Sequence, residues 1–176
     1  MNYLCPGGDV GALASYCQLR QPTSTQRDDL AEDADAAQAA VEGRCGPVLL
    51  RTVTYRILNA TRAVALLSRA SEVLSFVGDT GSTLAPADFL AEGQTVRLTP
   101  FSGLVIPPGV ITYRSGWIQS EIPSPLIIAG RIIARQLWRA RIGNARAEGE
   151  PGVGVLIPRQ AELLMEPYEL APLGFS

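Results

Sequence analysis

One apolar segment, residues 126–142, constrains the fold of this chain more than any other feature. At about 100° per residue it forms a helix with an ordinary core stripe on one face. The stripe consists of Leu126, Ala129, Gly130, Ile133, Leu137 and Ala140. The opposite face interleaves Arg131, Arg135 and Arg139 with Ile127, Ile128, Ile132, Trp138 and Ile142. Because an unpaired charge is costly to bury, this face either meets a partner with acidic or phosphate groups, or lies in its own domain with the arginines reaching water.

The length and composition fit a single globular domain. Of 176 residues, 47% are hydrophobic, which is enough for an extensive core. Arginines interrupt the apolar segment, so we expect no membrane span. The N-terminal residues MNYLCPGGDV lack the basic start and apolar run of a secretion signal, so we expect a protein of the cytoplasm.

The residue types that are missing exclude most catalytic chemistry. All 15 basic residues are arginine, and the chain has no lysine and no histidine. Serine and cysteine nucleophiles usually need a histidine or lysine base, and the phosphate-binding P-loop needs its Gly-Lys pair. Cys5, Cys17 and Cys45 lack CxxC spacing and are interpreted as reduced, buried thiols. We therefore expect no enzyme, no catalytic residue, no cofactor and no metal.

A strongly acidic helix is predicted over residues 26–44, with Ser24 or Thr25 as its N-cap and Gly43 and Gly46 at its end. Its mostly alanine stripe, which permits close approach of another backbone, consists of Leu30, Ala34, Ala37 and Val41. Its outer face carries Asp28, Asp29, Glu32, Asp33, Asp35 and Glu42. Six acids against Arg27 and Arg44 give this helix a charge of −4, whereas the five arginines of residues 126–147 meet no acid and give +5.

Between these helices the hydrophobic period changes from about 3.6 residues to 2, which indicates strands. A short helix, capped by Asp9, is expected over residues 9–19. The predicted strands are residues 49–57, 63–67, 72–77, 88–90, 95–98 and 110–113, separated by turn signals such as Gly78-Asp79-Thr80-Gly81. They would form a small antiparallel sheet. A helix over residues 59–74 is the competing interpretation, because that stretch also contains good helix formers.

The C-terminal third begins with Pro123-Ser124-Pro125, a typical helix start, and Gly143-Asn144 is a natural stop. The glycine-rich residues 149–155 follow a helix rather than a strand and are interpreted as a turn. A short helix is expected over residues 158–165, followed by an apolar tail of residues 167–176. The tail either folds back on its own domain or docks on a partner.

The predicted fold class is therefore α+β, a small helical bundle with an inserted antiparallel β-sheet or hairpin region. We expect one domain over residues 1–176, with a helical core of residues 9–46 and 123–166, a β-rich insertion of residues 48–115 and a C-terminal extension of residues 167–176.

This order of elements resembles the head-to-tail connector (adaptor) family of long-tailed bacteriophages. The resemblance spans essentially the whole chain and is carried by LASYCQL, AAVEGRCG, VITYRSGW, ARQLWR and GVGVLIPRQAELLMEPY. The most specific parts are ITYRSGW followed by ARQLWR, and the IPRQAELL helix. The long insertion of residues 59–108 matches only in character.

The resemblance implies a structural virion protein that forms a ring, commonly of twelve copies, beneath the portal vertex. Such a ring joins the portal protein to a head-closure or tail protein, and genomic DNA passes through its lumen without sequence-specific binding. The location would be the neck of the virion, at the head-tail interface, after assembly in the cytoplasm of a bacterial host. C-terminal segments of the family often reach the portal, so Tyr168, Leu170, Leu173 and Phe175 are proposed as a docking tail.

A closed ring needs two different complementary surfaces on one chain, and the acidic and basic helices supply them. The proposed subunit interface consists of Asp28, Asp29, Glu32, Asp33, Asp35, Arg131, Arg135, Trp138 and Arg139, or uses Arg141 and Arg146 at the end of the second helix. In the alternative, the two helices pack together within one monomer. Arginines that hold DNA in the lumen are a weaker hypothesis, because the net charge is −2.

Other functional classes remain open at the level of sequence. Another ring-forming neck or tail-completion protein, such as a head-closure protein or tail terminator, would also lack catalysis. Those proteins resemble small sheet-dominated domains, whereas here helices bracket the strands. A small-molecule binding module or an enzyme built on the central sheet would need a deep pocket with convergent acids.

Overall fold

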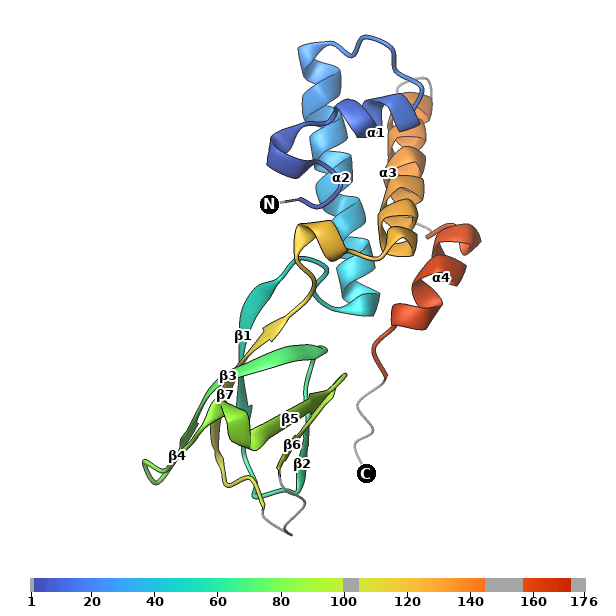
Figure 1. Cartoon of the computed structure of the whole chain (residues 1–176). Coiled ribbons are helices and arrows are strands. Elements are labelled where there is room, and N and C mark those ends of the chain that lie inside the picture. The colour runs from blue at the N-terminus through green and yellow to red at the C-terminus, as the bar shows by residue number, and fades with distance from the viewer. Residues whose placement is uncertain (1, 100–104, 145–156, 172–176) are drawn as a thin grey trace. The chain divides into compact units, whose positions relative to one another are not determined.

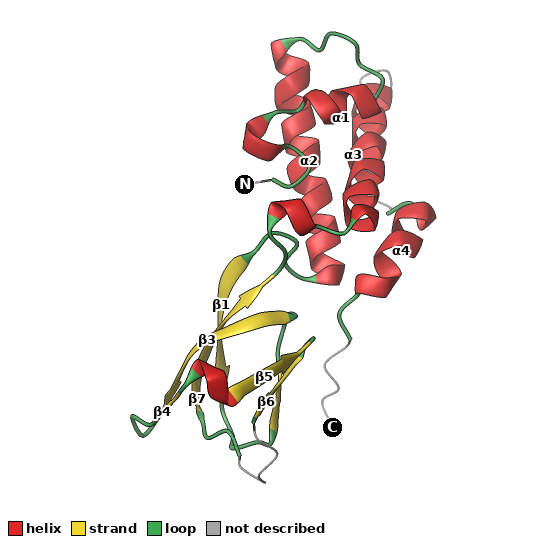
Figure 2. Cartoon of the chain, in the orientation of Figure 1, coloured by secondary structure: helices red, strands yellow, loops and turns green. Residues whose placement is uncertain are grey.

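The computed structural model describes residues 2–99, 105–144 and 157–171. The chain divides into two compact units. Residues Met1–Val48 and Glu121–Glu169 form a helical unit, and Leu49–Ser120 with Leu170–Ser176 form a sheet unit. Helices in one unit and antiparallel strands in the other (Figure 2) confirm the predicted α+β class.

The helical unit is built on two long helices that run side by side, α2 (Ser24–Cys45) and α3 (Ser124–Asn144) (Figure 1). The short helix α1 (Gly11–Tyr16) contacts both of them, and α4 (Arg159–Met165) packs mainly on α3. Short 3₁₀ turns at Pro6–Gly8 and Glu166–Tyr168 complete the unit. A further 3₁₀ turn, Gln119–Glu121, precedes α3.

The start of α2 differs from the prediction by one or two residues. The N-cap is Thr23, not Ser24 or Thr25. The Thr23 hydroxyl accepts a hydrogen bond from the Gln26 amide, and the Gln26 side chain accepts one from the Thr23 amide, which makes a capping box. At the other end Gly43 lies inside the helix, and Gly46, with a φ of 74°, ends it.

The core stripe of α2 is confirmed, because Leu30, Ala34, Ala37 and Val41 are fully buried. The stripe of α3 is rotated relative to the prediction. Leu126, Ala129, Gly130 and Ile133 are buried as expected, but Leu137 is half-buried and Ala140 is exposed. Ala134 and Trp138 are buried in their place. The unit thus covers α3 from more than one side, while Ile128 and Ile142 stay exposed.

The N-terminal segment belongs to this core, which the sequence did not predict. Tyr3, Leu4 and Cys5 are buried, and the Tyr3 hydroxyl lies 3.4 Å from the Leu126 carbonyl oxygen. Burial raises the pKa of Tyr3 above its usual range. Gly130 allows this approach, since a Cβ at that position would lie 2.6 Å from the Tyr3 hydroxyl oxygen.

The two short helices are held by local and long-range polar contacts. α1 is shorter than predicted, and the Asp9 carboxylate accepts a hydrogen bond from the Gly11 amide at 2.8 Å, although the N-cap position is Val10. Near α4, Arg44 forms ion pairs with Glu162 at 3.0 Å and with Glu169 at 3.3 Å. Arg44 therefore ties the end of α2 to α4 and the turn that follows it.

The sheet unit contains two antiparallel sheets rather than the single sheet that was predicted. The first has the strand order β1-β7-β3-β4 and the second β2-β6-β5. The strands are β1 (Arg51–Ile57), β2 (Ala63–Ala65), β3 (Ala70–Gly78), β4 (Thr83–Leu84), β5 (Phe89–Glu92), β6 (Thr95–Leu98) and β7 (Gly109–Ser115). A 3₁₀ turn, Pro86–Asp88, precedes β5. The competing helix over residues 59–74 is wrong, since β2 and part of β3 occupy that stretch.

The core of the sheet unit lies on one face of the first sheet. Tyr113, Phe76 and Ile111 are almost fully buried there, and the Tyr113 hydroxyl lies 3.1 Å from the buried Ser68 hydroxyl. Near the two ends of the segment Leu49–Ser120 the backbones of Leu49 and Trp117 pair with each other. Leu50 donates a backbone hydrogen bond to the Trp117 carbonyl oxygen at 2.8 Å, so both connections to the helical unit start from adjacent backbone.

Candidate assembly surface of the helical unit

The acids predicted for the interface lie along α2 but differ in exposure. Asp28 and Asp35 are exposed, and Asp35 accepts a hydrogen bond from the Asn2 side chain at 2.7 Å. The Glu32 side chain is 72% exposed. Asp33, predicted for the outer face, is buried, because its position borders the Leu30–Ala34 stripe. We define the acidic side of α2 as Asp28, Glu32 and Asp35, the exposed acids of this helix.

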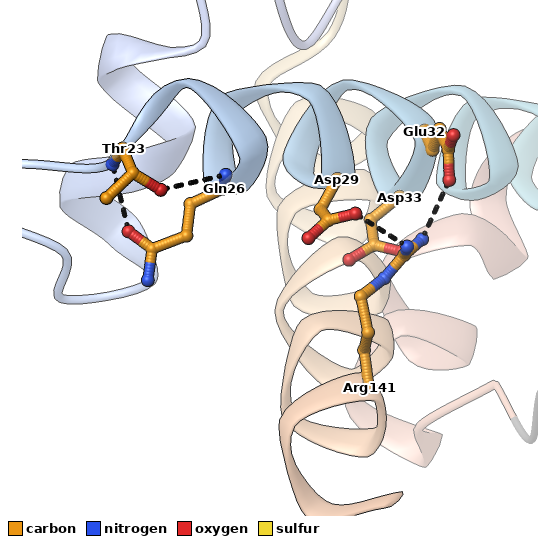
Figure 3. A network of polar contacts seen from close by, with 6 residues as sticks. All are labelled: Thr23, Gln26, Asp29, Glu32, Asp33 and Arg141. Atoms are coloured by element: carbon orange, nitrogen blue, oxygen red, sulfur yellow. Dashed lines mark hydrogen bonds and ion pairs between the residues drawn. The ribbon is translucent and has the colours of Figure 1, made fainter. Parts of the chain in front are cut away.

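A single arginine gathers three carboxylates at the end of α3 (Figure 3). The Nη1 atom of Arg141 donates to Asp29 at 2.9 Å, and its Nη2 atom donates to Glu32 at 3.1 Å and to Asp33 at 3.0 Å. The planar guanidinium suits this role, because its donors form a rigid fork. Arg141 therefore pairs with α2 inside one chain, as the alternative interpretation of the two helices expected.

Burial sets the electrostatics of this cluster. The Asp33 side chain is only 6% exposed, and this desolvation raises the pKa of its carboxyl group, although Arg141 opposes the shift. The hydrogen bond to Asp33 raises the pKa of Arg141. Within the described residues the second Asp33 oxygen, Oδ2, is buried without a hydrogen-bond partner. The pairing thus connects two helices and leaves three acids sharing one positive charge.

The arginines of α3 form a second surface. Arg131 is half-buried, and its buried Nε has no hydrogen-bond partner among the described residues. The guanidinium carbon of Arg135 lies 5.6 Å from the centroid of the Tyr16 ring, a cation–π contact. Arg139 is exposed. In the part of the chain that the structure describes, neither Arg135 nor Arg139 has a carboxylate partner.

Arg135 and Arg139 line an open groove of about 390 Å³. Its other lining residues come from the end of α1, from α3 and from the start of α4: Tyr16, Ile132, Gln136, Pro158 and Gln160. The groove thus combines two guanidinium groups and two side-chain amides with apolar surface from Ile132 and Pro158. We call this feature the arginine groove.

Trp138, which was predicted to lie in the subunit interface, is buried within its own chain. Only 4% of the residue is exposed, so it belongs to the core of the helical unit. The turn predicted for residues 149–155 lies outside the described residues, within the stretch 145–156. Arg146, the alternative interface residue, also lies outside them.

The predicted docking tail is described only in part. Tyr168 is half-buried in the turn after α4. Leu170 is half-buried in the sheet unit, where the next residue, Ala171, donates its amide to the Gln94 side chain at 2.7 Å. Leu173 and Phe175 lie outside the described residues.

Among the described residues no group of three or more His, Cys, Asp or Glu side chains is placed to hold a metal ion. Cys5 and Cys45 are buried free thiols, and Cys17 is a half-buried one. None of the helices in residues 2–99, 105–144 and 157–171 is long and apolar enough to cross a bilayer.

Sequence reasoning missed the groove and the network because both depend on distant segments. Tyr16 meets Arg135, and Asp33 meets Arg141, across more than a hundred residues of chain. The capping box had a local signal, since Thr23 and Gln26 have the required three-residue spacing.

Comparison with known proteins shows a shared fold without sequence similarity. No protein-family model matches the chain, and no curated protein matches it in sequence. Among solved structures it is similar to a chain described as "Neck of empty GTA particle computed with C6 symmetry", where GTA denotes a gene transfer agent. The TM-score is 0.65 at 17% sequence identity, over 95% of this chain and 91% of that chain.

Proposed function

We propose that the protein is a structural component of the neck of a bacteriophage or phage-like particle, with no enzymatic activity. The observation that carries this proposal is the match of nearly the whole chain to a neck chain of a GTA particle. Because the match covers 95% of this chain, it includes the sheet unit as well as the helical unit. The resemblance to head-to-tail connectors supports the same role from independent features of the sequence.

In this role the protein forms a ring, with twelve copies as the expected number, between the portal protein and a head-closure or tail protein. Genomic DNA passes through the lumen and is not bound in a sequence-specific way. A net charge of −2 supports this, because proteins that hold DNA carry a basic excess. The ring would lie at the head-tail interface of the virion and assemble in the host cytoplasm.

The proposed contact between subunits joins the acidic side of α2 to the arginine side of α3. Asp28, Glu32 and Asp35 remain outward on the first side, and Arg131, Arg135 and Arg139 lie on the second. Such a contact is heterologous, so it can repeat around a closed ring. Exposed Ile128 and Ile142 add apolar area to the same helix. The C-terminal extension of residues 167–176, with Tyr168, Leu170, Leu173 and Phe175, is proposed to reach the portal.

The experiment that tests this function is electron microscopy of the purified protein mixed with its cognate portal. We expect a ring of density on the portal face that carries the tail, and loss of binding when the chain is truncated after Glu169. The counterpart in cells is a particle assembled without this protein, which should lose its genome and fail to acquire a tail. Full, tailed particles without the protein would refute the proposal.

A further inference from the structure

The arginine groove carries positive charge on two arginine side chains, Arg135 and Arg139. Arg44, Arg56, Arg97, Arg114 and Arg141 form ion pairs with carboxylates of the same chain. Arg135 and Arg139 line the groove, and within the described residues neither has a carboxylate partner. The Arg135 guanidinium is instead positioned by the Tyr16 ring. Within the described residues the groove is therefore a cationic site without a carboxylate partner from its own chain.

The chemistry of the lining selects the kind of group that fits. Guanidinium groups bind carboxylates through paired hydrogen bonds, and the Gln160 amide can add a further donor. Ile132 and Pro158 supply apolar surface for the methylene groups of acidic side chains. This combination suits the side chains of an acidic helix.

An acidic helix of matching geometry lies on the same chain. Arg135 and Arg139 are four residues apart on α3, and Asp28 and Glu32 are four residues apart on α2. Each pair is therefore separated by about 6 Å along its helix axis. Two helices that pack nearly parallel or antiparallel can place both pairs in contact at once.

We infer that the arginine groove of one copy receives the Asp28–Glu32 edge of α2 from a second copy. This inference rests on the proposed ring and names its acceptor site and its ligand. Arg141 contributes within each chain, because it donates to one oxygen of Asp33 and one oxygen of Glu32 while the Glu32 side chain stays 72% exposed. The acids that remain outward are then available to the next copy.

Charge reversal on each side tests the contact. The first variant is Arg135→Glu with Arg139→Glu, and the second is Asp28→Arg with Glu32→Arg. Sedimentation velocity of the full chain, up to millimolar concentration and at low salt, measures self-association. We expect each variant to weaken association at least about tenfold relative to the unaltered chain, because like charges then face each other. Added salt should weaken association of the unaltered chain.

Combining the reversals distinguishes a specific contact from a general charge effect. A chain with all four substitutions again presents complementary surfaces, so its association should return toward that of the unaltered protein. Mixing the two variants should also restore association. The control is Arg56→Glu with Arg62→Glu, two exposed arginines of the sheet unit with the same change in charge, which should leave association unchanged. Helical circular dichroism confirms that each variant is folded.

Three results would overturn the inference. One is an unaltered chain that stays monomeric at every concentration in low salt. Another is failure of the four-substitution chain, when folded, to associate. The third is a groove that binds duplex DNA, seen as DNA retention that Arg135→Glu with Arg139→Glu abolishes while association persists. A normal ring on the portal with either variant would reject the groove contact and leave the proposed function intact. Absence of any ring on the portal with the unaltered chain would reject the function itself.

Discussion

Replacing Arg141 with methionine should destabilise the helical unit through Asp33. The substitution keeps the aliphatic stem but removes the only cation that hydrogen-bonds the Asp33 carboxylate in the described structure. Removing one partner of a fully buried pair costs about 3–5 kcal/mol. The Asp33 side chain is 6% exposed but that of Arg141 is 39% exposed, so solvent screens part of the interaction. We expect a loss of about 2 kcal/mol in the free energy of unfolding near neutral pH.

The pH dependence of this loss has a definite sign. Burial raises the pKa of Asp33 in the folded state above its value in the unfolded state. Protonation of Asp33 at low pH therefore stabilises the fold, and this stabilisation is lost as the pH rises through the pKa of the folded state. Arg141 lowers that pKa, and Arg141→Met therefore raises it further. The cost of the substitution should be largest at about pH 7–8 and smaller at about pH 4–5, where more of Asp33 is protonated.

Urea unfolding followed by helical circular dichroism measures the effect, because the long helices lie in the helical unit. In an Asp33→Asn background the cost of Arg141→Met should fall, since no buried charge is then left unpaired. The control is Arg114→Met, which removes an ion pair with Glu72 between half-exposed side chains and should cost less than about 1 kcal/mol. An Arg141→Met cost that is independent of pH and unchanged by Asp33→Asn would refute the reasoning.

Two further substitutions test packing and capping. Gly130→Ala should destabilise the helical unit by about 1–3 kcal/mol, because the new Cβ would lie 2.6 Å from the Tyr3 hydroxyl oxygen. Gly43→Ala, in α2 with no atom within 4 Å of its Cβ position, is the matched control and should stabilise by up to about 1 kcal/mol. Thr23→Ala should cost about 0.5–2 kcal/mol in urea unfolding by removing the capping box, whereas Thr25→Ala should have little effect. Equal costs within either pair would contradict the structure.

Local sequence patterns predicted the parts of the fold that depend on neighbouring residues. The stripe of α2 and the ends of α3 follow from helical periodicity, proline and glycine, which act within a few residues. Most strands were found for the same reason. The missed strand, β4, contains only Thr83 and Leu84, which is too short for an alternating pattern.

The remaining errors concern contacts between distant segments. Trp138 was predicted on the face of α3 opposite the core stripe, and packing from more than one side of the helix buries it. Asp33, beside the buried stripe of α2, has its charged partner in Arg141, 108 residues later. The groove likewise requires Tyr16, α3 and the start of α4 to meet. A single sequence contains the side chains of such sites but not the pairing of the segments that carry them.

The hydrogen bond between Leu50 and Trp117 bears on how proteins of this kind can diversify. Because the strand-rich segment enters and exits through adjoining backbone, it can be removed and the gap closed by a short turn, or another fold can be installed at the same junction. Evolution can therefore replace this segment with another one that fits a different partner protein. The helices of the other unit would keep their own packing.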